Sequence, residues 1–346
     1  MNFKRSIRIL TQRDLLDAGC FDIKAVIEVC RKALISYAKG DVIFPDKTSV
    51  IFDEATQDRI NCLPAGFREA KVYGMKWVSV FPQNPIAYGC PNLSAVVLLS
   101  ELTTGYPVAF MEGTMLSNLR TAAMSALAAR YLARRDSSEI GFIGSGEQAK
   151  SHFLSMKAEF PGIRVCRVSS GSRESVSAFV SQMSKFHPEV EFRVCNEDYQ
   201  SAIEGSDIIV TAISGQEPIL KAAWIKSGAF YCHVGGYEDE FAVAQKADKI
   251  VCDNWDVVKH RTQTISRMYK AGLLKDADIH ANLHEIVNGM RPGRENDLEF
   301  VYYNGVGLSF IDVAVANWAY GLTICRNVGS EIQMLEGSMF DVKGTK

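Results

Sequence analysis

The stretch "IGFIGSGEQA", from Ile140 to Ala149, decides the fold of this chain. A short apolar run precedes Gly144, Ser145 and Gly146, and Ala149 stands where a dinucleotide-binding fingerprint accepts glycine or alanine. Two glycines one residue apart permit a tight turn and a close approach to a phosphate, and the first amides of a following helix would face a pyrophosphate. We therefore expect a dinucleotide turn here. A glycine loop that only packs a helix against a strand is the alternative.

Downstream of this turn, short apolar runs alternate with amphipathic stretches as far as Tyr303. The expected strands are Ile140–Ile143, Arg164–Val168, Val190–Val194, Ile208–Ala212, Ala229–His233, Lys249–Cys252 and Phe300–Tyr303. Expected helices such as Glu147–Glu159 and Glu174–Phe186 lie between them. This alternation indicates a parallel sheet with helices on both faces, so we expect an α/β fold with a Rossmann domain.

The residues before the turn follow a different pattern. Helical spacing of apolar residues predicts helices at Asp22–Tyr37 and Leu116–Arg134, and a last helix follows the expected strands at Ile311–Arg326. Between Val42 and Leu102, short β-type runs broken by proline and glycine predict an antiparallel sheet. Since 346 residues exceed the size at which single cores usually stop growing, we expect two domains.

Composition and charge exclude several classes of partner. With 38 basic and 40 acidic residues, the formal net charge of -2 gives no electrostatic footprint for nucleic acid or an anionic membrane. The N-terminal residues lack the apolar run of a signal peptide, and no segment approaches twenty uninterrupted apolar residues, so we expect a cytoplasmic protein. Nine scattered cysteines without a C-x-x-C pair predict reduced thiols. His280 and His284 have the spacing of a metal pair but no evident third ligand, so we expect no metal.

The residues that would meet the adenosine ribose leave the choice of cofactor open. The second expected strand ends in Ser169 and Ser170, where an NAD-binding fingerprint asks for Asp or Glu. Without that acid a 2'-phosphate would not be repelled, and Arg173 or Arg167 could pair with it. Ser170 could instead bond to an unphosphorylated ribose. The expected cofactor is therefore NAD, with NADP possible.

Four charged groups are candidates for chemistry. Lys76 lies in an apolar strand and Arg120 in a helix of small residues, where each would bind an anion or form a structural salt bridge. Glu238 begins an acidic run after a core strand, at the sheet edge where α/β proteins bind ligands, although a solvated loop is the default interpretation. Asp312, at the start of the last helix, is either a cap or an acid held near a nicotinamide.

The segments "GMKWV", "LSNLRTAAMSALAARYLA", "IGFIGSGEQA", "SDIIVTAIS", "KSGAFYCHVGG" and "GRENDLEFVYYNGVGLSFIDVA" resemble, in order, those of the ornithine cyclodeaminase and mu-crystallin family. The resemblance implies an α+β substrate-binding and dimerisation domain, here residues 1–127 plus 310–346, with the Rossmann domain inserted as residues 128–309. It also implies a homodimer and a small amino-acid substrate. The inserted domain explains why the dinucleotide turn lies so far from the N-terminus.

The resemblance also assigns residues to ligands. Lys47, Lys76 and Arg120 match the cations that bind substrate carboxylates. Other residues fall at or beside the cofactor contacts of the family. With the residues of the turn, Arg120 and Arg173 added, the expected cofactor-binding residues are Asn92, Arg120, Gly144, Ser145, Gly146, Glu147, Gln148, Ser170, Arg173, Thr211 and Asn304. Two departures argue against ring-closing deamination, because Tyr237 and Asn61 replace the catalytic Asp and Glu of cyclodeaminases.

Within the family, the chain is similar to the N-(2-amino-2-carboxyethyl)-L-glutamate dehydrogenases, which make 2,3-diaminopropionate for siderophores and peptide antibiotics. The shared features include "PxxK", "DNW" at Asp253–Trp255 and "PGRE" at Pro292–Glu295. This similarity implies oxidation of a secondary amine and hydrolysis of the imine, with Lys76, Asp312 and Glu238 as catalytic candidates. The alternatives are a cyclodeaminase-like enzyme, an imine reductase or amino-acid dehydrogenase, and a mu-crystallin-like protein that only holds the cofactor.

Overall fold

The computed structural model describes residues 4–53 and 56–337, and the chain divides into two compact units. Unit 1 comprises Met1–Asp22, Lys39–Ser117 and Ser309–Lys346, and unit 2 comprises Ile23–Ala38 and Asn118–Leu308. This division differs from the predicted domains at two larger points and, at Ser309, by a single residue. The helix Ile23–Ala38 belongs to unit 2, because its buried apolar stripe packs against helices of that unit, and the boundary in the long central helix lies at residue 118 rather than 128.

Unit 1 is built on a mixed eight-stranded sheet with hydrogen-bonded order β16-β1-β7-β6-β5-β4-β2, and β3 pairs with β4. Its elements are β1 (Lys4–Leu10), α1 (Gln12–Asp17), β2 (Val42–Ile43), β3 (Thr48–Asp53), β4 (Asp58–Phe67), β5 (Val72–Val80), α3 (Asn84–Ala87), β6 (Leu93–Glu101), β7 (Pro107–Glu112), α12 (Ser309–Arg326) and β16 (Ser330–Glu336). The predicted antiparallel sheet of residues 42–102 is confirmed, since all pairs among β2 to β7 are antiparallel. The sheet is mixed because β1, outside that segment, runs parallel to β7. Strands β1 and β16 were not predicted.

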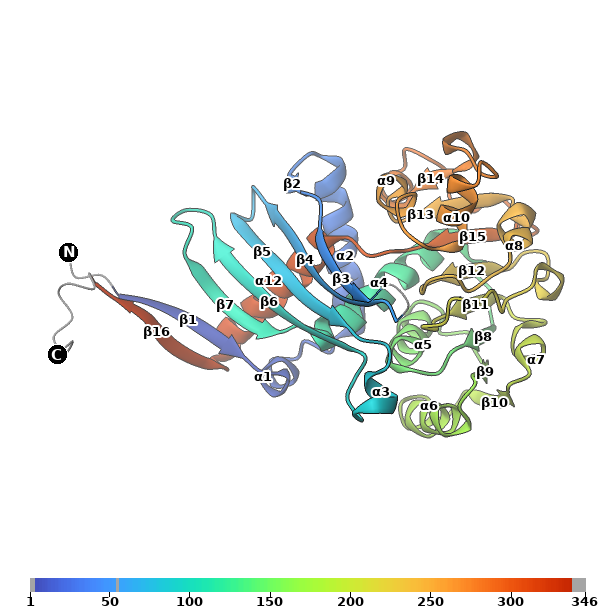
Figure 1. The fold of residues 1–346 in the computed structure, drawn as a ribbon, viewed down its shortest axis with the longest axis horizontal. Helices are drawn as coiled ribbons and strands as arrows, with labels where there is room; N and C mark the ends of the chain where they lie inside the picture. Colours follow the sequence, from blue (N-terminus) through green and yellow to red (C-terminus); the bar gives the residue numbers. More distant parts are fainter. Residues whose placement is uncertain (1–3, 54–55, 338–346) are drawn as a thin grey trace. The chain divides into compact units, whose positions relative to one another are not determined.

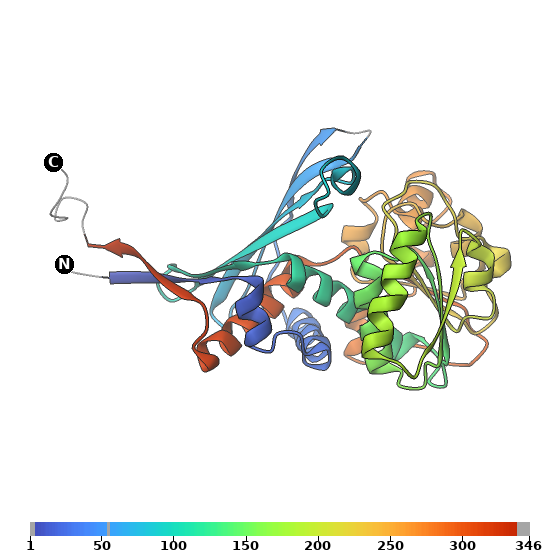
Figure 2. The same cartoon turned by 90° about the horizontal axis from the view of Figure 1, so that it is seen from below.

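Helix α12 covers one face of this sheet, across β4, β5 and β6 (Figures 1 and 2). On β5, alternate residues Val72, Gly74, Lys76 and Val78 are buried, as expected for a strand with one covered face. Gly74 has no room for a side chain, because a Cβ there would lie 2.6 Å from both Leu98 O and a Leu99 methyl carbon. On β5 the covered face therefore includes the cation Lys76, which needs a polar partner.

Unit 2 is a Rossmann-type α/β unit. All strand pairs of its eight-stranded sheet are parallel, in the order β10-β9-β8-β11-β12-β15-β13-β14. Its elements are α2 (Ile23–Ala38), β8 (Glu139–Ile143), α5 (Glu147–Glu159), β9 (Val165–Ser169), α6 (Arg173–Phe186), β10 (Glu191–Asn196), α7 (Tyr199–Ile203), β11 (Ile208–Thr211), η1 (Ala222–Trp224), β12 (Phe230–His233), α8 (Phe241–Lys246), β13 (Lys249–Cys252), α9 (Trp255–Val258), α10 (Thr264–Lys270), η2 (Asp276–Asp278), β14 (Ala281–Asn282), α11 (Leu283–Val287) and β15 (Val301–Asn304). Helix α4 (Thr114–Leu132) begins in unit 1 and continues in unit 2.

Two neighbouring residues of β8 show why helices cover both faces of the sheet in unit 2. Phe142 packs against Phe179 of α6, which in turn contacts Phe153 of α5, so these helices share one face (Figure 2). Gly141 points to the other face, where a Cβ would collide with Ala202 O of α7. Because successive residues of a strand face opposite sides, both sides of β8 are buried. The predicted α/β alternation is thereby confirmed, with strand ends that differ by one or two residues.

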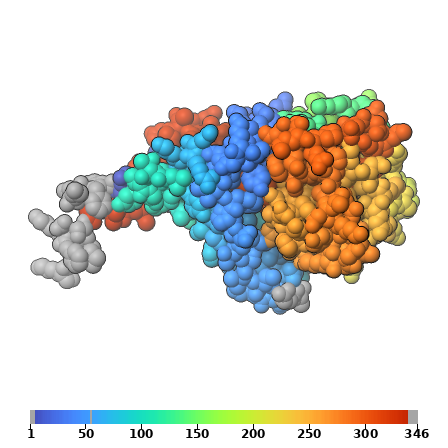
Figure 3. Space-filling model, turned by 90° about the horizontal axis from the view of Figure 1, so that it is seen from above, coloured from blue at the N-terminus to red at the C-terminus, as the bar shows by residue number. Residues whose placement is uncertain are grey.

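The segment between β13 and β15 forms much of one face of unit 2, shown in orange in Figure 3, and includes α9, α10 and α11. All nine cysteines are free thiols, and five of them are buried. Within residues 4–53 and 56–337, none of the helices is long and apolar enough to span a bilayer.

Candidate active site

The turn after β8 has the geometry that a pyrophosphate requires. Gly144 has a φ of +106°, and a Cβ there would collide with the backbone carbonyl of Ala212, so only glycine fits. Gly146 caps α5, and a Cβ built on it meets nothing within 4 Å. Gly146 therefore leaves room beside the N-terminus of this 13-residue helix, which is the positive end of its dipole. Ser145 is buried and donates to Ser175 Oγ at 2.7 Å, which ties the turn to α6.

The next two residues of the predicted cofactor set lie in the first turn of α5. Glu147 is exposed and forms an ion pair with Lys150 at 2.7 Å. Gln148 donates to Asn118 Oδ1 at 2.7 Å, and its buried Oε1 has no hydrogen-bond partner in the described part of the chain. Asn92 belongs to unit 1, where it is exposed and its carbonyl accepts from Phe81 N at 2.8 Å.

At the ribose end, β9 finishes at Ser169 without an acidic residue. Ser170 is half-buried and donates its amide to Asn196 O at 3.0 Å. Arg173, the first residue of α6, is exposed. Arg167 was the second candidate for pairing with a 2'-phosphate. Its guanidinium is instead bound to Glu139 at 2.6 Å across the sheet. Of the two arginines, Arg173 remains accessible to a ribose phosphate.

In unit 1, Lys76 Nζ donates to Asp312 Oδ1 at 2.8 Å and to Ser117 Oγ at 3.1 Å. Both charged side chains are nearly inaccessible, with 3% and 2% exposure. Asp312 lies in the first turn of α12, where the helix dipole favours an anion. The pair thus resolves the problem of a lysine on a covered sheet face. It also provides a buried acid and a buried cation 2.8 Å apart, an arrangement suited to holding and moving a proton. Lys47 is half-buried in the segment between β2 and β3 of the same unit.

Arg120 lines a small recess at the carboxyl ends of β12, β13 and β15, beneath one face of α4. Asp253, which directly follows β13, also lines it, and its buried carboxylate accepts from Val306 N at 2.9 Å and Gly307 N at 2.8 Å. Burial raises the pKa of Asp253 to about 6, against the lowering effect of these amides and of Arg120. Sequence patterns did not single out Asp253 as a site residue, although its place after a core strand was a usable signal.

A buried Ser-His contact borders the same recess. His152 Nδ1 bonds to Gln148 O at 2.7 Å, so this nitrogen carries the proton and Nε2 accepts from Ser125 Oγ at 2.9 Å. Burial lowers the pKa of His152 to about 4, which keeps the ring neutral. No local sequence pattern indicates this pair, because its members are 27 residues apart on different helices.

The acidic run after β12 is not a solvated loop, and that prediction was wrong for its first two members. Glu238 and Asp239 are fully buried. The carboxylate of Glu238 accepts from Thr211 Oγ1 at 2.7 Å, Ile213 N at 2.7 Å and Gly235 N at 2.8 Å. These bonds join the turns after β11 and β12. The side chain of Glu238 is therefore committed to backbone support, which favours a positioning role over the proposed acid-base role.

Two of the remaining predicted cofactor contacts belong to this interior. The hydroxyl of Thr211 is consumed by Glu238 and by Tyr231 Oη at 2.8 Å. Asn304, at the end of β15, is fully buried and donates to His233 O at 3.4 Å. Burial raises the pKa of the neighbouring Asp239 to about 6.

The comparisons with known proteins agree with this geometry. The model of the ornithine cyclodeaminase/mu-crystallin family matches residues 16–323. The chain belongs to this family. It is 28% identical over 95% of its length to the N-((2S)-2-amino-2-carboxyethyl)-L-glutamate dehydrogenase of Staphylococcus aureus, of which 99% is covered. It is 31% identical over 94% of its length to an alanine dehydrogenase of Archaeoglobus fulgidus, of which 98% is covered.

Solved structures of the family superpose closely on this chain. The Δ1-pyrroline-2-carboxylate reductase of Thermococcus litoralis, in complex with NADH and L-proline, has a TM-score of 0.89 and 31% identity, with 94% of this chain and 100% of that chain covered. An archaeal alanine dehydrogenase dimer with bound NAD has a TM-score of 0.87 and 29% identity, with 96% and 100% covered. The family members with similar folds are therefore named for different activities.

The two departures from the cyclodeaminase pattern have structural roles in this family member. Tyr237 stands in place of the expected Asp. The guanidinium of Arg267 lies over its ring, 4.5 Å from the centroid, in a cation–π contact. Asn61, in place of the expected Glu, is buried on β4 and accepts from Ser49 Oγ at 2.7 Å. Neither side chain can replace a carboxylate as a proton acceptor.

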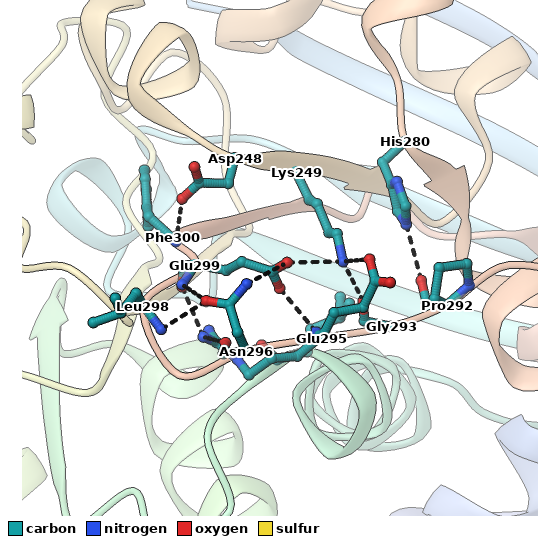
Figure 4. A network of polar contacts seen from close by, with 12 residues as sticks. Asp248, Lys249, His280, Pro292, Gly293, Glu295, Asn296, Leu298, Glu299 and Phe300 are labelled. Atoms are coloured by element: carbon teal, nitrogen blue, oxygen red, sulfur yellow. Dashed lines mark hydrogen bonds and ion pairs between the residues drawn. The ribbon is translucent and has the colours of Figure 1, made fainter.

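The "PGRE" segment, used above as a mark of one subgroup of the family, lies at the amino ends of the strands in unit 2 (Figure 4). Lys249, the first residue of β13, bonds to Glu295 at 2.6 Å and lies 3.1 Å from Glu299. Arg294 donates to Leu132 O at 2.7 Å. Since ligands of parallel sheets bind at the carboxyl ends, this segment supports the fold and does not itself report on the substrate.

The two histidines with metal-pair spacing are used in other contacts. His280 Nε2 bonds to Pro292 O at 2.9 Å, and His284 packs edge-on against Tyr37 at 5.0 Å. The described residues contain no group of three His, Cys, Asp or Glu side chains arranged for a metal.

Proposed function

We propose that this chain is an NAD(P)-dependent oxidoreductase that acts on the carbon–nitrogen bond of an amino acid. The observation that carries the proposal is the turn after β8, where Gly144 excludes any side chain and Gly146 leaves open space before α5. Relatives at 28–31% identity bear the names of dehydrogenases and reductases, and two solved ones hold NAD or NADH. The buried Lys76–Asp312 pair adds a candidate acid–base group to this proposal.

Our substrate hypothesis is N-(2-amino-2-carboxyethyl)-L-glutamate, which would be oxidised to an imine and hydrolysed to 2,3-diaminopropionate and 2-oxoglutarate. The support is the similarity to the staphylococcal dehydrogenase and the presence of three cations, Lys47, Lys76 and Arg120, for a substrate with three carboxylates. The second candidate is reduction of a simpler imine or oxidation of a simple amino acid. It is supported by the similar identity to alanine dehydrogenase and to pyrroline-2-carboxylate reductase.

Bound NAD(P) would supply the hydride acceptor for the α-carbon of the glutamate portion. The residues of the turn, Gly144 to Gln148, would hold the dinucleotide, while Arg120 and Lys76 would bind carboxylates and orient the carbon–hydrogen bond. Oxidation also releases the amine proton, and water then adds to the imine carbon. Asp312 is the proposed acceptor of the amine proton and of the two protons of the added water. It returns two protons to the nitrogen, one as water adds and one as the carbon–nitrogen bond breaks. The net change consumes one water and releases one proton with the reduced cofactor.

The decisive experiment incubates the purified protein with N-(2-amino-2-carboxyethyl)-L-glutamate and either NAD or NADP. We expect the absorbance of the reduced nicotinamide to rise together with equimolar 2-oxoglutarate and 2,3-diaminopropionate, measured by mass spectrometry. L-alanine, L-ornithine and pyrroline-2-carboxylate with the matching cofactor form serve as comparisons. Faster turnover of one of these three would contradict the substrate hypothesis and favour the second candidate.

Cofactor preference gives a further prediction. Arg173→Gln should weaken NADP(H) binding by about tenfold and leave NAD(H) binding unchanged, because a charge-assisted bond to a 2'-phosphate is lost. The measurement is the dissociation constant of each reduced cofactor by fluorescence titration. Arg167→Gln is the matched control and should change neither constant, since Arg167 is paired with Glu139. Equal losses for both cofactors in Arg173→Gln would rule out this role.

We further propose that unit 1 mediates a homodimer. Several large apolar side chains of its sheet are exposed, among them Ile51, Phe52 and Trp77, at 44%, 60% and 46%. A solved family member is described as a dimer. Light scattering gives the mass in solution directly.

A further inference from the structure

Two adjacent tyrosines of β15 differ in the use of their hydroxyl groups. Tyr302 and Tyr303 are both essentially inaccessible, at 0% and 1% exposure. On one side of the strand, Tyr302 Oη donates to Asp239 Oδ1 at 3.2 Å. On the other side, Tyr303 stacks on Phe230, and its hydroxyl has no hydrogen-bond partner within the described residues. A buried hydroxyl without a partner costs stability, and phenylalanine would fill the same space without that cost.

The hydroxyl-bearing side chain of Tyr303 lines the recess that also contains Arg120, Ser125 and Asp253. The recess lies at the carboxyl ends of β12, β13 and β15, which is the ligand-binding edge of a parallel sheet. The position of the unused hydroxyl therefore coincides with the part of unit 2 where a small ligand is expected.

The turn after β15 leaves room for the polar groups of this recess. A Cβ at Gly305 would lie 3.1 Å from Tyr303 Oη. At Gly307, where φ is +84°, a Cβ would collide with Arg120 Nη1 and lie 3.1 Å from its Cζ. Asp253 fixes the same turn through the amides of residues 306 and 307. Both glycines thus allow the turn to approach Tyr303 Oη and the guanidinium closely.

The chemistry of the Tyr303 hydroxyl and the Arg120 guanidinium indicates the kind of ligand that the recess would bind. Burial, with a smaller effect of Asp253, raises the pKa of Tyr303 well above its ordinary value, so the phenol keeps its proton and can donate. The guanidinium of Arg120 has only donors. The Asp253 carboxylate of the same recess already accepts from the amides of residues 306 and 307. A phenol donor and a guanidinium lining one recess suit an anionic acceptor such as a carboxylate or a phosphate.

The order of strands in the sheet distinguishes a substrate carboxylate from a cofactor phosphate as the ligand of this recess. The pyrophosphate would lie at the turn after β8, and β15 is three strands away from β8 in the order β8-β11-β12-β15. At about 4.8 Å per strand, the two sites are about 14 Å apart. We propose that Tyr303 donates a hydrogen bond to a carboxylate of the amino-acid substrate beside Arg120. This assignment rests on the proposed function, because it supposes an amino-acid or 2-oxo-acid ligand.

Tyr303→Phe tests the assignment with the smallest possible change. We expect KM for the substrate to rise at least tenfold, the dissociation constant of NADH to stay within twofold of wild type, and Tm to stay equal or rise. Tyr302→Phe is the matched control, because it removes a hydroxyl from the neighbouring residue. It should lower Tm, since Asp239 loses a donor, and leave KM unchanged.

Three outcomes would overturn the assignment. A lower Tm with unchanged KM in Tyr303→Phe would show that a trapped water satisfies the hydroxyl. A selective loss of NADH affinity would assign the recess to the cofactor, and no change in any quantity would leave the hydroxyl without a role in binding.

Failure of the proposed function is detected separately, in the wild type. If N-(2-amino-2-carboxyethyl)-L-glutamate is not turned over, the same variants are compared on whichever of L-alanine, L-proline or L-ornithine is, because each carries an α-carboxylate. Binding of 2-oxoglutarate and pyruvate to the NADH complex provides a readout without turnover. A wild type that binds none of these carboxylates refutes the assignment as well.

Discussion

Lys76→Met combined with Asp312→Asn should lower kcat/KM by about two to three orders of magnitude while the protein remains folded. The double change removes both charges of the buried pair, so neither is left without a partner on the covered face of the sheet. Activity falls because the substrate loses a carboxylate-binding cation and the proposed proton acceptor together. Steady-state kinetics and Tm of the double variant measure the two effects independently.

The single variants divide the loss between binding and proton transfer. Asp312→Asn keeps an acceptor for Lys76 Nζ, and it should reduce kcat at least about tenfold with unchanged affinity for the cofactor. Lys76→Met alone leaves the Asp312 carboxylate buried, so it should cost about 3–5 kcal/mol of stability as well as activity. If Asp312→Asn has wild-type turnover, Asp312 is not a catalytic residue and the pair is a structural salt bridge.

Glu238→Ala should lower the free energy of unfolding by about 3–5 kcal/mol. The change leaves Thr211 Oγ1, Ile213 N and Gly235 N without their acceptor in the interior of unit 2. Because the last two belong to the turns after β11 and β12, the affinity for the dinucleotide should fall as well. Urea denaturation followed by circular dichroism gives the first quantity, and NADH titration gives the second.

Glu240→Ala is the matched control for this prediction. Glu240 is half-buried, and its carboxylate accepts from Ala222 N at 2.8 Å. Its removal should cost about 1 kcal/mol and leave NADH binding unchanged. A similar, small loss of unfolding free energy in both variants would mean that water replaces the carboxylate of Glu238. The proposal that Glu238 supports the two turns would then be wrong.

The parallel sheet of unit 2 was predictable because its strands are buried on both faces and read as continuous apolar runs. Lys249–Cys252 was predicted with the bounds that β13 has in the structure. In contrast, β1 and β16 were missed. Strand β16 is exposed along its whole length, so it has no buried apolar face. The parallel pairing of β1 with β7 joins residues about 100 positions apart, and local patterns hold no information about it.

By itself, the sequence determined the dinucleotide turn, since an apolar run, two glycines one residue apart and a helix-forming stretch follow one another within a short segment, and the positive φ of Gly144 is a local property of the backbone. It also determined the family, through motifs in their order along the chain. Only the tertiary structure decided which charges are paired. Lys76 and Asp312 are 236 residues apart, and Glu238 is buried because amides from two separate turns compensate its charge. The physical reason is that the free energy of a buried charge depends on partners that are adjacent in space and distant in sequence.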